Sequence, residues 1–165
     1  MPQQIVFGII SALHDLFTAM WIGGLLTTAL SFMPVFKESR DKIKGLVVLL
    51  DGYQRKLANY VLISIVGLWI TGLLLSKQSP AYSGFMNFST TSNALLSIKH
   101  ILIFVMIIIG LYRRFVLGRK LKSFSEQQQK TYGILLMVNA LLGVVVLFLS
   151  GIGASFSQGV LLSIR

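Results

Sequence analysis

Four long apolar runs alternate with polar segments along the chain. The runs cover about residues 5–36, 58–76, 94–112 and 132–156. A helix needs roughly 20 apolar residues to cross the hydrocarbon core of a bilayer, so each run is long enough to span a membrane. Their interruptions are mostly Gly, Ser and Thr, which membrane helices use for close packing. The pattern predicts an all-α fold: one four-span domain over residues 1–165, folded as an integral-membrane four-helix bundle in a lipid bilayer.

The polar segment between the first two runs also carries a helical pattern. Ile43, Leu46, Val47 and Leu50 recur at helical spacing among charged residues. Residues 41–53 are therefore predicted to form a short amphipathic helix on the inner membrane surface. An ordinary cytoplasmic helix packed against the end of the bundle would show the same spacing, and the sequence does not separate these two interpretations.

The charged residues orient the predicted bundle. Charged residues make up 12% of the chain, whereas a soluble domain has roughly 25%. Twelve of the 15 Lys and Arg residues lie between the first two spans or between the last two. The positive-inside rule then puts both of these loops in the cytoplasm and both termini outside. Because this rule explains the net charge of +10, nucleic acid is not an expected partner.

Few residues inside the spans can carry chemistry. The chain has no Cys, which excludes a disulfide framework, a thiolate metal site and a covalently attached c-type haem. The ionisable groups within the spans are His14, Asp15, Lys99 and His100, and such groups mark functional sites in membranes. The predicted topology places all four in the outer half. Two His from facing bundle helices can form a metal or cofactor site, so His14 is the expected ligand and His100 its expected partner. Whether both bind one metal stays open, since the two can lie at different depths in the membrane.

Helical spacing adds further residues to this candidate site. Thr18 and Trp21 share a face with His14, and the small and polar stripe of the fourth span includes Ser150. The predicted cofactor-binding set is His14, Thr18, Trp21, Lys99, His100 and Ser150. Structural roles explain the same residues: the stripe suits helix packing, Trp21 suits the core, and Lys99 suits snorkelling to the surface. A buried imidazole also needs a partner, which Asp15, Lys99 or a hydroxyl such as that of Ser150 would provide without any metal.

The first span resembles the first helix of copper resistance protein D (CopD-like) domains, in which L-H-x6-W-x-G-G is typical. The matching positions are Leu13-His14, Trp21 and Gly23-Gly24. Thr71-Gly72-Leu73 resembles the T-G-L near the end of their second helix, and Lys99 with the aliphatic run after it resembles the start of their third. The resemblance implies a multi-pass protein of the plasma membrane that handles copper, or one that binds b-type haem through His14.

The related HemJ-type protoporphyrinogen oxidases share the first-helix His and the third-helix Lys, which correspond to His14 and Lys99. They also carry an Asn-Glu-x-Pro element in the last helix. Here Asn139 is followed by Ala140 where that element has Glu, and by Leu142 where it has Pro. This departure disfavours a porphyrinogen oxidoreductase.

Residue chemistry and resemblance favour different cofactors. Haem b needs one or two imidazoles in a cavity walled by small and aromatic residues, which the inward stripes offer. Copper in transit prefers His, Met and Cys donors, and here Cys is absent and the Met residues do not cluster. We therefore expect a metal-handling membrane protein with a haem b site, or else a copper site, acting in electron transfer or copper homeostasis. Quinone, porphyrin or a copper-carrying protein would be its partner. An oxidoreductase and a non-catalytic assembly subunit stay open as alternative functions. The sequence does not determine the oligomeric state.

Overall fold

The computed structural model describes residues 2–39, 46–77, 87–117 and 126–163, and every regular element in these residues is a helix. Helices long and apolar enough to cross a membrane run through Gln3–Val35, Gly52–Ser76, Asn93–Leu117 and Lys130–Phe156. The predicted all-α membrane bundle is therefore confirmed. The orientation, with both termini outside, stays a prediction.

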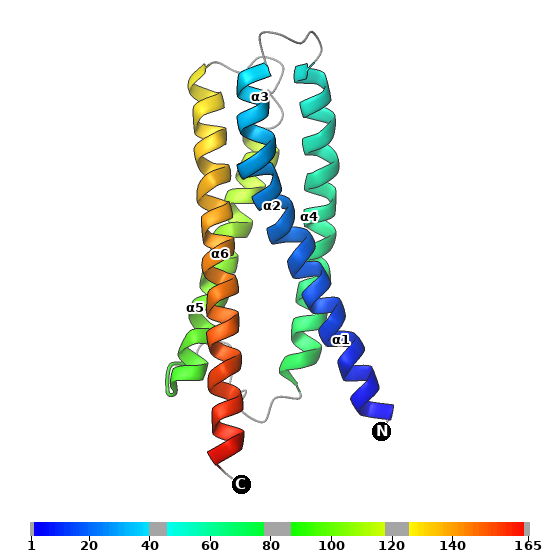
Figure 1. Ribbon diagram of the computed structural model, residues 1–165, viewed down its shortest axis with the longest axis vertical. Coiled ribbons are helices and arrows are strands. Elements are labelled where there is room, and N and C mark those ends of the chain that lie inside the picture. Colours follow the sequence, from blue (N-terminus) through cyan, green and yellow to red (C-terminus); the bar gives the residue numbers. More distant parts are fainter. Residues whose placement is uncertain (1, 40–45, 78–86, 118–125, 164–165) are drawn as a thin grey trace.

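The first span is a continuous helix whose hydrogen-bonding pattern changes along its length (Figure 1). Its parts are α1 (Pro2–Thr18), the π-helical segment η1 (Ala19–Gly23), α2 (Gly24–Thr27), the π-helical segment η2 (Thr28–Phe32) and α3 (Met33–Ser39). Segment η2 ends two residues before Pro34 and contains Leu30, the residue four positions before the proline. A proline has no N–H to donate to the carbonyl four residues earlier, so a widened turn here gives up few hydrogen bonds. Figure 1 shows the N-terminal end of α1 leaning away from α6.

Helix α4 (Leu46–Ser76) contains the second span and also much of the segment predicted to lie on the inner membrane surface. Residues 46–53 are helical, as expected, but they form the first turns of the 31-residue α4 and not a separate helix. The predicted start of that helix, at residue 41, lies outside the described residues. The helix continues without a break because Gln54, Arg55 and Lys56, which join the segment to the span, are all good helix formers.

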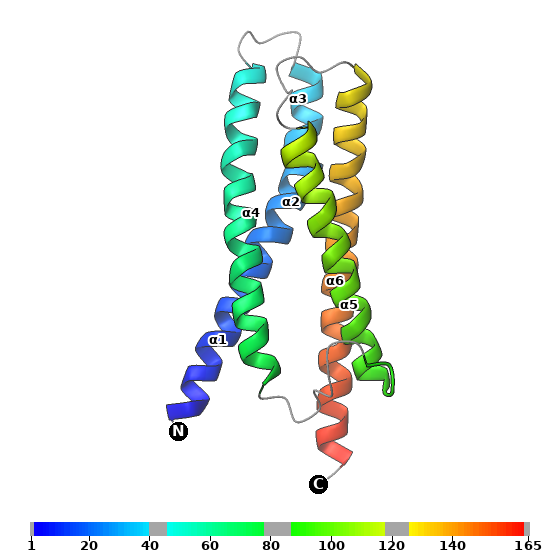
Figure 2. The same ribbon diagram turned by 180° about the vertical axis from the view of Figure 1, so that it is seen from behind.

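The second half of the chain forms α5 (Thr91–Tyr112), the π-helical segment η3 (Arg113–Leu117) and α6 (Glu126–Ser163). Thr90 caps α5, because its hydroxyl accepts a hydrogen bond from the Asn93 N–H at 3.3 Å. Helix α5 packs along α6, and α1 packs along α4, so the bundle is built from two helix pairs (Figures 1 and 2). The pairs meet where η1, α2 and η2 contact α6.

Apolar side chains form a buried core at this junction. Its members are Trp21, Ile22, Leu25, Ala29, Met106, Leu136, Ala140 and Val146. Gly143 permits the close approach, since a Cβ at this position would lie 3.0 Å from Ile22 and 3.4 Å from Met106. Around the outside, large apolar side chains such as Ile108, Leu141 and Phe148 are exposed. Such a surface suits contact with lipid acyl chains, as expected of a multi-pass membrane protein.

Candidate functional site: two histidines and an arginine-lined cavity

His14 and Thr71 contact each other across α1 and α4. The Thr71 hydroxyl donates to the Gly67 carbonyl at 2.7 Å and lies 2.8 Å from the His14 Nδ1 atom. A hydroxyl has a single hydrogen, so Thr71 accepts the second bond and His14 donates it from Nδ1. A neutral imidazole protonated at Nδ1 carries its lone pair on Nε2. This tautomer is the one that binds a metal through Nε2.

Small residues on α4 make this contact possible. A Cβ at Gly67 would overlap the ring of Phe17, which fills the space one turn from His14. A Cβ at Gly72 would lie 3.6 Å from the His14 Cε1 atom, which is ordinary contact. Gly67 is therefore the position where only hydrogen fits, and it sets the distance between α1 and α4.

The other ionisable groups of the spans lie within electrostatic range of His14. Lys99, Asp15 and His100 all interact electrostatically with the His14 imidazole. Lys99 is half-buried and also interacts with Asp15, which is exposed. The His100 Nδ1 atom donates to the Leu96 carbonyl of its own helix at 2.7 Å. His14 on α1 and Lys99 and His100 on α5 therefore lie toward the same end of the bundle, where α4 ends and α5 begins.

The remaining predicted site residues are engaged elsewhere. The Thr18 hydroxyl donates to the His14 carbonyl at 2.9 Å, within α1. Trp21 is part of the buried core. The Ser150 hydroxyl donates to the Val146 carbonyl at 2.9 Å, within α6. The hydroxyl that meets the His14 ring is thus that of Thr71 and not that of Ser150. The sequence carried the signal, since Thr71 lies in the T-G-L motif of an inward face, but nothing local pairs it with His14.

The protein ligands available to a metal are few. No group of three or more His, Asp or Glu side chains comes together in the described part of the chain to hold a metal ion. A metal at this end would be bound mainly by the imidazoles of His14 and His100. Copper and iron both accept imidazole, and so the donor set fits copper or a haem iron better than a hard cation such as Mg²⁺.

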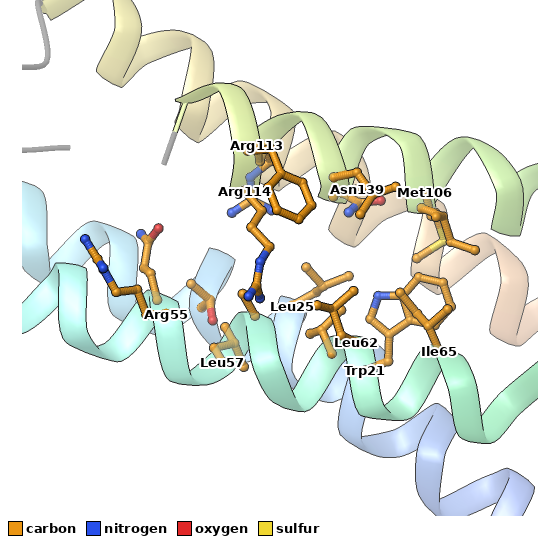
Figure 3. A pocket seen from close by; sticks show the side chains of 18 of the residues that line it. Trp21, Leu25, Arg55, Leu57, Leu62, Ile65, Met106, Arg113, Arg114 and Asn139 are labelled. Carbon is orange, nitrogen blue, oxygen red and sulfur yellow. The ribbon is translucent and has the colours of Figure 1, made fainter. Parts of the chain in front are cut away.

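Toward the opposite end of the bundle lies a cavity of about 290 Å³ that sequence analysis missed (Figure 3). It lies between the two helix pairs, and neither His lines it. Its polar lining residues are Thr28, Gln54, Arg55, Arg113, Arg114, Tyr132 and Asn139. The positive-inside rule already accounts for the arginines among them as the ends of basic loops, so the sequence alone does not mark a cavity here.

The sequence profile of copper resistance protein D matches residues 53–152 of the chain. The chain belongs to the copper resistance protein D (CopD) family. Comparison with curated proteins and with solved structures finds no match. The CopD match contains Thr71, Lys99 and His100 and begins after His14. The match does not cover the first span, so the resemblance of that span to CopD-like domains depends on the residues of the span alone.

Proposed function

We propose that this CopD family protein handles copper through a site at His14, with His100 supplying a second imidazole. The observation that carries the proposal is the hydrogen bond from His14 Nδ1 to Thr71 at 2.8 Å. It sets the tautomer in which Nε2 is the donor atom. A hydrogen-bonded second nitrogen is the usual arrangement for a metal-binding histidine.

The charges of Asp15 and Lys99 near His14 favour transient binding of copper over its storage. Asp15 is exposed beside His14 and would attract a cation. Lys99 is half-buried within electrostatic range of His14 and, when protonated, would repel a cation. A copper ion held by two imidazoles next to a lysine would be bound and released easily. In the predicted orientation this site belongs to the outer half of the plasma membrane, so copper would enter from outside.

Haem b is the second candidate, and one observation favours it. His100, like His14, donates from Nδ1, in its case to the Leu96 carbonyl at 2.7 Å. Both imidazoles would then have Nε2 available to hold a haem iron. Bound haem would supply one-electron transfer, for which a membrane quinone is a fitting partner.

Two measurements on the purified full-length protein separate these functions. Copper affinity is measured by competition with a chromophoric Cu(I) chelator, and haem by its Soret absorbance. We expect His14→Ala to abolish copper binding, His100→Ala to weaken it, and Ser155→Ala, an exposed hydroxyl on α6, to leave it unchanged. A Soret band lost in His14→Ala would establish haem instead. Unchanged copper content in His14→Ala, with no Soret band, would contradict both proposals and favour an assembly subunit.

A further inference from the structure

The cavity at the basic end of the bundle contains polar atoms that lack partners. Buried side-chain atoms without a hydrogen bond are Gln54 Nε2, Arg113 Nε, Arg114 Nη1 and Asn139 Oδ1. All four residues line the cavity. Three of the atoms are N–H donors and one is an acceptor. Buried donors are almost always paired in native proteins, so this set points to a ligand that accepts hydrogen bonds.

Existing contacts orient the unpartnered donors. The Tyr132 hydroxyl donates to the Gln54 Oε1 atom, which leaves the Gln54 NH₂ group for another acceptor. Arg114 Nη2 donates to the Asn59 Oδ1 atom at 2.9 Å, which leaves Nη1. The guanidinium of Arg113 lies over the Tyr132 ring, 4.4 Å from its centroid. The donors are therefore held in place before any ligand arrives, which lowers the entropy lost on binding.

The charge of the cavity selects an anion. Arg113 is only 8% exposed, and an arginine in a protein stays charged. None of the described residues that line the cavity is Asp or Glu. Three guanidinium groups, those of Arg55, Arg113 and Arg114, with no carboxylate among the described lining residues would repel a copper ion and attract a negatively charged oxygen group.

The rest of the lining is apolar and suits a ligand with a hydrocarbon part. Leu25, Leu62, Ile65 and Met106 line the side of the cavity toward the middle of the bundle (Figure 3). The volume of about 290 Å³ is at the small end for ligand sites. The site is also separate from the histidines, because 13 residues of helix, about 20 Å, lie between His100 and Arg113.

We propose that this cavity binds a phosphate group through Arg113, Arg114 and Gln54. Phosphate oxygens accept several hydrogen bonds at once, and arginine matches their geometry. The group would come from an anionic phospholipid headgroup of the adjacent leaflet or from free phosphate. Basic pockets between membrane helices bind lipid headgroups in this way. Asn139 Oδ1 would accept from a headgroup hydroxyl.

The test uses the full-length protein in dodecyl maltoside, a detergent without phosphate, with or without added phosphatidylglycerol. Native mass spectrometry counts retained lipid, and thermal unfolding in the detergent alone reports stabilisation by inorganic phosphate. Retained phosphatidylglycerol with no phosphate effect identifies a lipid site, and the reverse identifies a phosphate site. If phosphatidylglycerol is not retained and phosphate does not stabilise the protein, the proposal is overturned. Water would then be the partner of these donors.

Two variants assign the binding to the cavity. The double variant Arg113→Gln with Arg114→Gln should reduce binding at least tenfold. Its matched control, Lys56→Gln with Lys130→Gln, removes two exposed charges at the same end and should bind normally. Gln54→Glu keeps the acceptor for Tyr132 and adds a carboxylate to the cavity. It should also lose binding while staying folded, with copper binding at His14 unchanged. Normal binding in both cavity variants would refute the assignment.

Discussion

The Thr71 hydroxyl lies 2.8 Å from the Nδ1 atom of His14, a residue 57 positions earlier in the chain. The same hydroxyl donates its hydrogen to the Gly67 carbonyl at 2.7 Å. Helix α4 therefore decides which nitrogen of an α1 histidine is protonated. The chemistry of the candidate copper site depends on this contact between two spans.

Removing the Thr71 hydroxyl should weaken copper binding without abolishing it. Thr71→Val keeps the side-chain volume but no longer orients His14, and loss of such an outer partner typically costs 10–100-fold in metal affinity. Chelator competition measures the change. Thr71→Ser retains the hydroxyl and should bind within about threefold of the unmodified protein, whereas equal affinity in Thr71→Val would show that the bond has no role in the site.

Gly67→Ala should separate α1 from α4. The new Cβ would overlap the Phe17 ring, and overpacking of this kind typically destabilises a core by about 1–3 kcal/mol. Denaturant unfolding in detergent measures the free energy of unfolding. The double variant Gly67→Ala with Phe17→Leu relieves the overlap and should recover part of the loss. Gly110→Ala, where nothing lies within 4 Å, serves as the control.

The orientation can be tested without removing native thiols, because the chain has no Cys. We expect Ser89→Cys, placed just before α5, to react with a membrane-impermeant maleimide in intact cells. Ser39→Cys, at the end of α3, should react only after the cells are opened. The reverse pattern would show that the basic loops lie outside.

Tyr132→Phe should destabilise the bundle through Gln54. The variant keeps the ring beneath Arg113 but removes the hydroxyl that donates to Gln54 Oε1. A buried acceptor left without a donor costs about 1–3 kcal/mol, which unfolding measurements resolve. Combining Tyr132→Phe with Gln54→Leu removes both partners. That pair should cost less than the sum of the two single changes, and strict additivity would mean that the bond contributes nothing.

Three features follow from the amino-acid sequence alone: the four spans, the basic character of the loops between them and the two histidines as candidate ligands. Hydropathy and charge are sums over neighbouring residues, so they can be read without knowing which helices touch. The helical character of residues 46–53 followed from spacing for the same reason. Their continuity with α4 did not, because the pattern of apolar positions does not say where one helix stops.

The contacts of the polar residues become visible only once the helices are packed. The tertiary structure paired His14 with Thr71 rather than with Ser150, and it turned Arg113 and Arg114 from markers of topology into the lining of a cavity. Both outcomes depend on how close the two helix pairs come, which is set by small residues such as Gly67 and Gly143 meeting large ones on another helix. Such contacts join positions far apart in the chain, and no local pattern records them, because their energy depends on distances that exist only after the helices have packed.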